Sequence, residues 1–199
     1  MTERPVLGLV LAAGASRRTG FPKALAVLDG ETLLQRACAA LRNGGCAAVY
    51  VVVGGMLEAS IREAMPAGAR LCENPAPHLG MSSSLASALM LPEVAEADAV
   101  VVSLVDHPRV TGETVAQLIA HWRESGAGVL RPTHAGRGGH PYVLDRRLFA
   151  EFLRLPRGSD PRPFFAAHLE SLDVDDPGIL DDADELHDLL ALGAEPPAF

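Results

Sequence analysis

VLGLVLAAGASRRTGFPK, residues 6–23, begins as a continuous apolar run and passes directly into a loop of small and basic residues. The run Val6–Leu11 is typical of a strand that is covered on both faces, because it lacks the polar alternation of a half-exposed strand. In sheets of this kind, ligands bind beyond the C-terminal ends of the strands. The segment therefore predicts both a buried strand and a binding loop that follows it.

Apolar runs and segments of helical period alternate along the rest of the chain. Alternation of this kind predicts right-handed crossovers and a mostly parallel, Rossmann-like sheet with helices on both faces. We therefore expect an α/β fold, in which residues 1–199 form a single three-layer α/β/α domain. The predicted strands are 6–11, 47–53, 69–72, 99–105, 128–130 and 142–144, and the predicted helices are 32–41, 57–65, 83–91, 111–122, 146–155, 163–172 and 183–190.

The composition excludes several classes of protein. With 48% hydrophobic and 21% charged residues, the chain is globular rather than disordered. The net charge is −8, and residues 163–199 contain neither Lys nor Arg, which argues against a nucleic-acid partner. Three cysteines without a C-x-x-C pair argue against a disulfide framework or a zinc site. No apolar run reaches the roughly 20 residues that span a bilayer, and the first residues lack the charge of a signal peptide. We expect a cytoplasmic protein without membrane contact.

The loop after the first strand has the composition of a phosphate site. Small residues allow a ligand to approach the backbone, and Arg18 and Lys23 carry charges that suit phosphate groups. Lys23 is the only lysine, whereas the other 16 basic residues are arginines, which indicates a need for a compact ammonium group. The spacing fits neither a Walker A loop nor G-x-G-x-x-G. A solvated loop with an accidental lysine is the alternative.

Two further groups follow predicted strands. Ser82, Ser83 and Ser84 lie at a loop-to-helix junction, where hydroxyl and backbone N–H groups can bind ribose or phosphate or simply cap the helix. Asp106 ends the most hydrophobic strand, which suits a metal ligand or a turn cap. The seven histidines show no H-x-x-x-H or H-x-H spacing, and this argues against a histidine metal site.

Residues 11–23 match the pattern L-A-A-G-x-S-x-R-x-G-x-P-K and resemble the MobA-like NTP transferase family, in particular its molybdenum cofactor cytidylyltransferase-like branch. Thr19 stands where Met is more usual. Further segments also resemble the family: Asn74 with G-M-S-S-S-L at 80–85, D-H-P at 106–108 with His107 in place of Gln, G-H-P around His140, and D-A-D at 182–184 without the usual Thr-Pro after it.

The resemblance implies transfer of a nucleoside monophosphate, CMP from CTP, to a phosphate-bearing acceptor of the molybdopterin type, with Mg²⁺ and release of pyrophosphate. Ala13 and the G-x-S-S-S-L segment favour CTP over GTP. The roles implied are contacts to base and ribose by Leu11, Ala12, Ala13, Gly14, Asn74, Ser82, Ser83 and Ser84, stabilisation of pyrophosphate by Arg18 and Lys23, metal binding by Asp106, Asp182 and Asp184, and acceptor binding by His140.

Three alternatives stay open from the sequence. Asp182 and Asp184 could equally cap the helix that follows them. The same family includes nicotine blue oxidoreductases, so an NAD(P)H-dependent reductase on this scaffold is one alternative function. A non-catalytic maturation factor that delivers cofactor to a molybdenum hydroxylase is the other.

Overall fold

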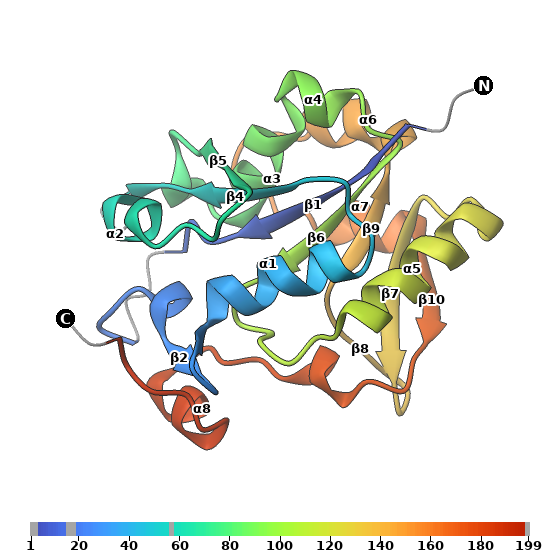
Figure 1. Ribbon diagram of the computed structural model, residues 1–199. Coiled ribbons are helices and arrows are strands. Elements are labelled where there is room, and N and C mark those ends of the chain that lie inside the picture. Colours follow the sequence, from blue (N-terminus) through green and yellow to red (C-terminus); the bar gives the residue numbers. More distant parts are fainter. Residues whose placement is uncertain (1–3, 15–18, 56–57, 198–199) are drawn as a thin grey trace.

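The computed structural model describes residues 4–14, 19–55 and 58–197. A central mixed sheet runs in the order β10-β7-β9-β6-β1-β4-β5, with β8 paired to β7, and helices cover both of its faces (Figure 1). The three-layer α/β fold expected from the sequence is therefore confirmed. The strands are β1 (Val6–Leu11), β2 (Val27–Leu28), β3 (Glu31–Thr32), β4 (Val49–Val53), β5 (Ala69–Glu73), β6 (Ala99–Leu104), β7 (Val129–His134), β8 (Arg137–Gly138), β9 (Tyr142–Asp145) and β10 (Leu169–Asp173).

The helices lie in two layers, one on each face of the sheet (Figure 1). Figure 1 shows α1 and α5 on one side of the sheet and α3, α4, α6 and α7 on the other. The α-helices are α1 (Leu33–Asn43), α2 (Glu58–Glu63), α3 (Met81–Leu89), α4 (Pro92–Ala95), α5 (Gly112–Ser125), α6 (Phe149–Leu153), α7 (Arg162–His168) and α8 (Leu186–Ala191); the 3₁₀ turns are Lys23–Leu25, Pro77–Leu79, Arg146–Leu148 and Pro177–Leu180.

The central strands are parallel, as predicted. β1 pairs in parallel with β4 and β6, and β4 with β5, so the C-terminal ends of these strands meet at one edge of the sheet. β9 is antiparallel to both β6 and β7, which makes the sheet mixed. The ends of β1 and β6 therefore place the loop after Leu11 beside the loop that carries Asp106.

The alternating directions of side chains in β1 explain why its sequence is apolar throughout. Val6 and Val10 pack with α1 and α5 in one core, whereas Leu7, Leu9 and Leu11 pack with α3, α6 and α7 in the other. A central parallel strand between two helix layers needs apolar side chains on both faces. The run that predicted the fold thus contributes to both hydrophobic cores.

The predicted helix over 163–172 is wrong in its second half. α7 ends at His168, and Leu169–Asp173 forms β10, which pairs in parallel with β7 at the edge of the sheet. Apolar residues at 164, 165, 169 and 172 suit a helical period, and periodicity alone does not locate the end of a short helix. Pairing with β7 decides the conformation here, because it satisfies the backbone groups of that strand edge.

The C-terminal helix packs away from the main sheet against the hairpin β2–β3. Leu28, Leu33 and Leu189 share a small third core with Ala183 and Ala194. The backbone of Val27 exchanges hydrogen bonds with Glu195. These contacts hold the chain at Ala183 and after residue 185 and so help to fix the course of residues 181–185 past the end of β6.

The three cysteines are buried and free. Burial raises the pKa of Cys38 to about 11, of Cys46 to about 12 and of Cys72 to about 11, so all three remain protonated thiols at neutral pH. Among the described residues, no helix has the length and apolar character needed to cross a bilayer.

Candidate active site

A cavity of about 420 Å³ opens where β1 and β6 end. Its volume lies within the range of small-molecule sites. The residues that line it come from segments far apart in the sequence and include Leu11, Ala12, Ala13, Gly14, Lys23, Ser84, Asp106 and Asp184. The backbone that leaves β1 therefore borders a cavity that also contains the predicted lysine and two of the predicted carboxylates.

Lys23 lies between two carboxylates. Its Nζ is 3.2 Å from Asp106 Oδ2 and 3.2 Å from Asp184 Oδ1, and only 11% of the lysine side chain is exposed. The 3₁₀ turn Lys23–Leu25 starts directly after Pro22 and directs the side chain inward. A largely buried ammonium group with two partners is held in position, and it can donate hydrogen bonds to anionic oxygen atoms in the cavity.

A second cluster lies on the other side of the Asp106 carboxylate. One ligand atom each from Asp106, His107 and Asp182 lie within 4.8 Å of one another. Asp106 Oδ1 is buried and has no hydrogen-bond partner among the described residues. Burial raises the pKa of Asp182 above its ordinary value, and the charges of Asp106 and Asp184 raise it further. A bound cation would relieve this repulsion and occupy the unpaired oxygen, so these residues fit a divalent metal.

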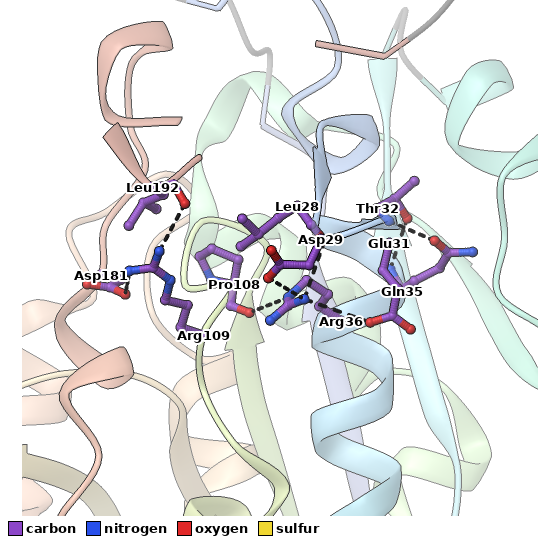
Figure 2. Close-up of polar contacts among 10 residues, drawn as sticks. All are labelled: Leu28, Asp29, Glu31, Thr32, Gln35, Arg36, Pro108, Arg109, Asp181 and Leu192. Carbon is purple, nitrogen blue, oxygen red and sulfur yellow. Dashed lines mark hydrogen bonds and ion pairs between the residues drawn. The ribbon is translucent and has the colours of Figure 1, made fainter. Parts of the chain in front are cut away.

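A strap, residues 176–184, brings Asp182 and Asp184 to this cluster. The Ala183 N–H donates to the carbonyl oxygen of Asp106 at 2.9 Å, which places the two aspartates on either side of that contact. Arg109 holds the strap next to this point, with Nη1 3.5 Å from Asp181 Oδ2 and Nη2 donating to the Leu192 carbonyl at 2.9 Å (Figure 2).

Arg36 of α1 holds the Asp106 loop from the opposite direction. Its Nε donates to the carbonyl of Pro108 at 3.0 Å, and Nη1 donates to the carbonyl of Leu28 at 3.3 Å (Figure 2). Thr32 and Gln35 form a capping box that fixes the start of α1 and therefore the position of this arginine. Arg36 and Arg109 together join the loop after β6 to the hairpin and to the strap.

Two glycines allow the strap to pass close to its neighbours. A Cβ on Gly178 would lie 2.4 Å from the Arg109 carbonyl oxygen, and one on Gly139 would lie 2.2 Å from the Ile179 carbonyl oxygen. Both distances involve backbone atoms, which cannot move aside cheaply. This close contact requires a glycine at position 139. The N–H of the next residue, His140, donates a hydrogen bond to the same Ile179 carbonyl.

The residues predicted to contact base and ribose divide into two groups. Ser84 lines the 420 Å³ cavity, whereas Asn74, Ser82 and Ser83 line a separate cavity of about 170 Å³ beside α6. Asn74 is buried, and its amide donates to the hydroxyls of Ser83 at 2.8 Å and Ser84 at 3.0 Å. Its side-chain oxygen accepts from the Ala76 N–H at 2.8 Å. Asn74 thus joins the loop after β5 to the first turn of α3.

His140 lies behind the carboxylate cluster rather than along the cavity. Its ring centroid is 4.7 Å from that of His107 and 5.9 Å from that of Tyr142. Burial lowers the pKa of His140 to about 4, and the neighbouring His107 and Arg131 add to this effect. At neutral pH the ring is therefore uncharged and can accept as well as donate a hydrogen bond.

The structure thus brings together Leu11, Ala12, Ala13 and Gly14 with Lys23, Ser84, Asp106 and the two strap aspartates. Arg18 lies outside the described residues. Sequence reasoning missed Arg36 and Arg109 as anchors, and it did not foresee that His107 would lie beside two carboxylates. The only sequence signal for Arg109 was its position just after D-H-P, because its contacts come from distant segments.

Comparisons with known proteins show the family of the chain. A family model described as the MobA-like NTP transferase domain matches residues 8–172. The chain is similar to Nicotine blue oxidoreductase of Paenarthrobacter nicotinovorans, with 32% identity over 154 residues that cover 74% of each protein. It is also similar to Molybdenum cofactor guanylyltransferase of Xanthomonas euvesicatoria pv. vesicatoria, with 36% identity over 118 residues, 59% of this chain and 56% of that one.

A solved structure is similar over nearly the full length. Rv0371c from Mycobacterium tuberculosis H37Rv has a TM-score of 0.79 and 29% identity, and the match covers 96% of this chain and 98% of that one. A structure of Rv0371c in complex with manganese has a TM-score of 0.75 with the same coverage. The fold and the family match define an NTP transferase. The chain belongs to the family of the MobA-like NTP transferase domain.

Proposed function

We propose that the protein transfers a nucleoside monophosphate, CMP from CTP, to a phosphate group of a molybdopterin-type cofactor. The observation that carries this proposal is the meeting of Lys23, Asp106 and Asp184 at one end of the 420 Å³ cavity bordered by the backbone of residues 11–14. Cation and carboxylates in this arrangement suit a triphosphate and its counter-ion.

The reaction requires no covalent enzyme intermediate. A phosphate oxygen of the acceptor forms a bond to the α-phosphorus, and the bond from that phosphorus to its bridging oxygen breaks. The electron pair leaves with pyrophosphate. Lys23 stabilises the charge that develops on pyrophosphate, with Arg18 as the partner expected from the sequence. The protein contributes mainly position and electrostatic stabilisation.

The remaining residues bind and orient the reactants. The backbone of residues 11–14 and the hydroxyl of Ser84 contact base and ribose, while Asn74 and Ser83 hold the loop in place. Asp106, Asp182 and Asp184 hold a divalent cation, a role supported by the structure of Rv0371c in complex with manganese. Such an ion, when bound, neutralises negative charge on the phosphates.

Release of pyrophosphate from each of the four NTPs tests the proposal, with and without a divalent metal and molybdopterin. We expect release with CTP only when metal and acceptor are both present. Two outcomes contradict the proposal. The first is oxidation of NAD(P)H with a dye acceptor and without pyrophosphate release, an activity favoured by the 32% identity to Nicotine blue oxidoreductase. The second is binding of molybdopterin without turnover of any NTP, as expected of a carrier for a molybdenum hydroxylase.

Lys23→Arg is expected to lower kcat/KM for the nucleotide at least about tenfold, which corresponds to about 1.4 kcal/mol in the barrier. The charge is retained, but a guanidinium group is too wide to lie 3.2 Å from both Asp106 and Asp184 in the largely buried lysine position. Steady-state kinetics would measure the change. Arg123→Lys, an exposed change on α5, is the matched control and should have no effect. Unaltered kinetics in Lys23→Arg would remove the argument from the single lysine.

A further inference from the structure

His107 belongs by position to the carboxylate cluster, although no sequence spacing marks it as a ligand. Its Nε2 lies 3.9 Å from Asp106 Oδ1, and ligand atoms of His107, Asp106 and Asp182 all lie within 4.8 Å of one another. Two ligands of one small divalent cation lie at most about 4.2 Å apart, twice the metal–ligand distance of about 2.1 Å. Rotations of exposed or partly exposed carboxylates are sufficient to close the remaining gap.

The imidazole of His107 has no hydrogen bond to any described residue. Its residue is 8% exposed, Nδ1 is buried without a partner, and Nε2 is farther from Asp106 than a hydrogen bond allows. Asp106 Oδ1 is also unpartnered. Burying a polar group without a partner costs about 1–3 kcal/mol, and the unpaired Asp106 Oδ1 lies 3.9 Å from His107 Nε2, so a ligand between these two atoms would satisfy the carboxylate oxygen. A cation accepts electron pairs from a carboxylate and an imidazole together.

The surroundings suit a cation as well. Asp106 and Asp182 contribute two carboxylates to the cluster that contains the ring, while the positive charge of Lys23 is shared between Asp106 and Asp184. On its other side, the His107 ring lies against His140 at 4.7 Å between centroids.

We propose that His107 is a nitrogen ligand of the divalent metal at Asp106 and Asp182, and that it shifts the preference of the site from Mg²⁺ towards Mn²⁺ and other transition-metal ions. The inference rests on the proposed function for the use of a metal. Mg²⁺ prefers an all-oxygen shell, whereas an imidazole nitrogen suits transition-metal ions better. Gln, the residue that the family resemblance leads one to expect here, would offer an amide oxygen instead.

The first test measures metal binding to the full chain without nucleotide. Electron paramagnetic resonance quantifies free Mn²⁺ during titration, and Mg²⁺ is then added as a competitor. We expect His107→Gln to weaken Mn²⁺ binding at least about tenfold while it leaves Mg²⁺ binding within about twofold, because an imidazole nitrogen is exchanged for a harder amide oxygen. His121→Gln, on the partly exposed surface of α5, is the matched control and should behave as the wild type. An unchanged Mn²⁺-to-Mg²⁺ selectivity in His107→Gln overturns the proposal.

The second test can be made on the wild-type protein alone. Electron spin-echo envelope modulation spectroscopy of bound Mn²⁺ detects ¹⁴N nuclei in the coordination shell of the ion. We expect an imidazole signal in the wild-type protein. Absence of this signal overturns the assignment, as does a signal that persists in a folded His107→Gln variant. Both measurements omit NTP and acceptor. A failed pyrophosphate assay together with a positive nitrogen signal would therefore count against the proposed function alone.

Discussion

Asp106→Ala is expected to reduce nucleotidyl transfer at least about 10²-fold, equivalent to about 2.7 kcal/mol of transition-state stabilisation. The Asp106 carboxylate belongs both to the ion pairs around Lys23 and to the cluster with His107 and Asp182. Its Oδ2 pairs with Lys23 at 3.2 Å, while Oδ1 is unpaired and lies in the cluster with His107 and Asp182. Its loss removes a metal ligand and leaves Lys23 less firmly oriented. Pyrophosphate release under saturating substrate measures the effect.

Asp106→Asn separates charge from shape in this prediction. The amide has nearly the same size but carries no negative charge, so we expect a loss close to that of the alanine variant. Glu93→Ala removes an exposed carboxylate at the start of α4 and should keep full activity. Far-ultraviolet circular dichroism would verify that the variants fold. Wild-type turnover in a folded Asp106→Ala protein would refute the assigned role.

Asp176→Ala is expected to lower the free energy of unfolding by about 3 kcal/mol. The carboxylate is 7% exposed and accepts four hydrogen bonds. Oδ2 accepts from the Thr111 N–H at 3.1 Å, the Thr111 hydroxyl at 3.0 Å and the Thr114 hydroxyl at 2.6 Å, and Oδ1 accepts from the Gly178 N–H at 2.9 Å. Alanine would remove the acceptor that these donors share and would also remove a favourable charge from the N-terminus of α5.

Urea unfolding followed through the fluorescence of Trp122, the only tryptophan, measures this loss. For a chain of this size the melting temperature should fall by roughly 6–12 °C. Asp175→Ala is the matched control, because the adjacent carboxylate is exposed and its removal should change stability by less than about 0.5 kcal/mol. Equal stabilities of the two variants would show that the buried hydrogen bonds contribute nothing net.

The sequence supports the main fold prediction because β1 and β6 carry strong local signals. A strand buried on both faces must be apolar at nearly every position, and that pattern is visible without any tertiary information. For 163–172 the apolar spacing predicted a single helix, although the second part of this segment is a strand. Contacts with β7 decided that Leu169–Asp173 is a strand, and a local pattern does not contain those contacts.

The sequence indicated the chemistry of some site residues, but it did not show which polar side chains bind other residues of the chain. The chemical type of Lys23 and Asp106 pointed to phosphate and metal chemistry, the family resemblance added Asp184, and the structure brings these three together. Asn74 was predicted as a ligand contact, yet its amide hydrogen-bonds to Ser83 and Ser84. A side chain that can bind a ligand can equally bind its own chain, and sequence does not distinguish the two.

The sequence by itself determined which segments are strands in the centre of the sheet, and it determined that a loop rich in small residues, with a single lysine, follows the first strand. Both properties depend on residue types within a few positions of each other. Only the tertiary structure decided that the strap meets the Asp106 loop, since Lys23 and Asp184 lie 161 residues apart. That meeting depends on Arg109, on the close passage at Gly178, and on the packing of α8 against the hairpin. Long-range contacts of this kind arise from the folded chain as a whole, so no local pattern encodes them.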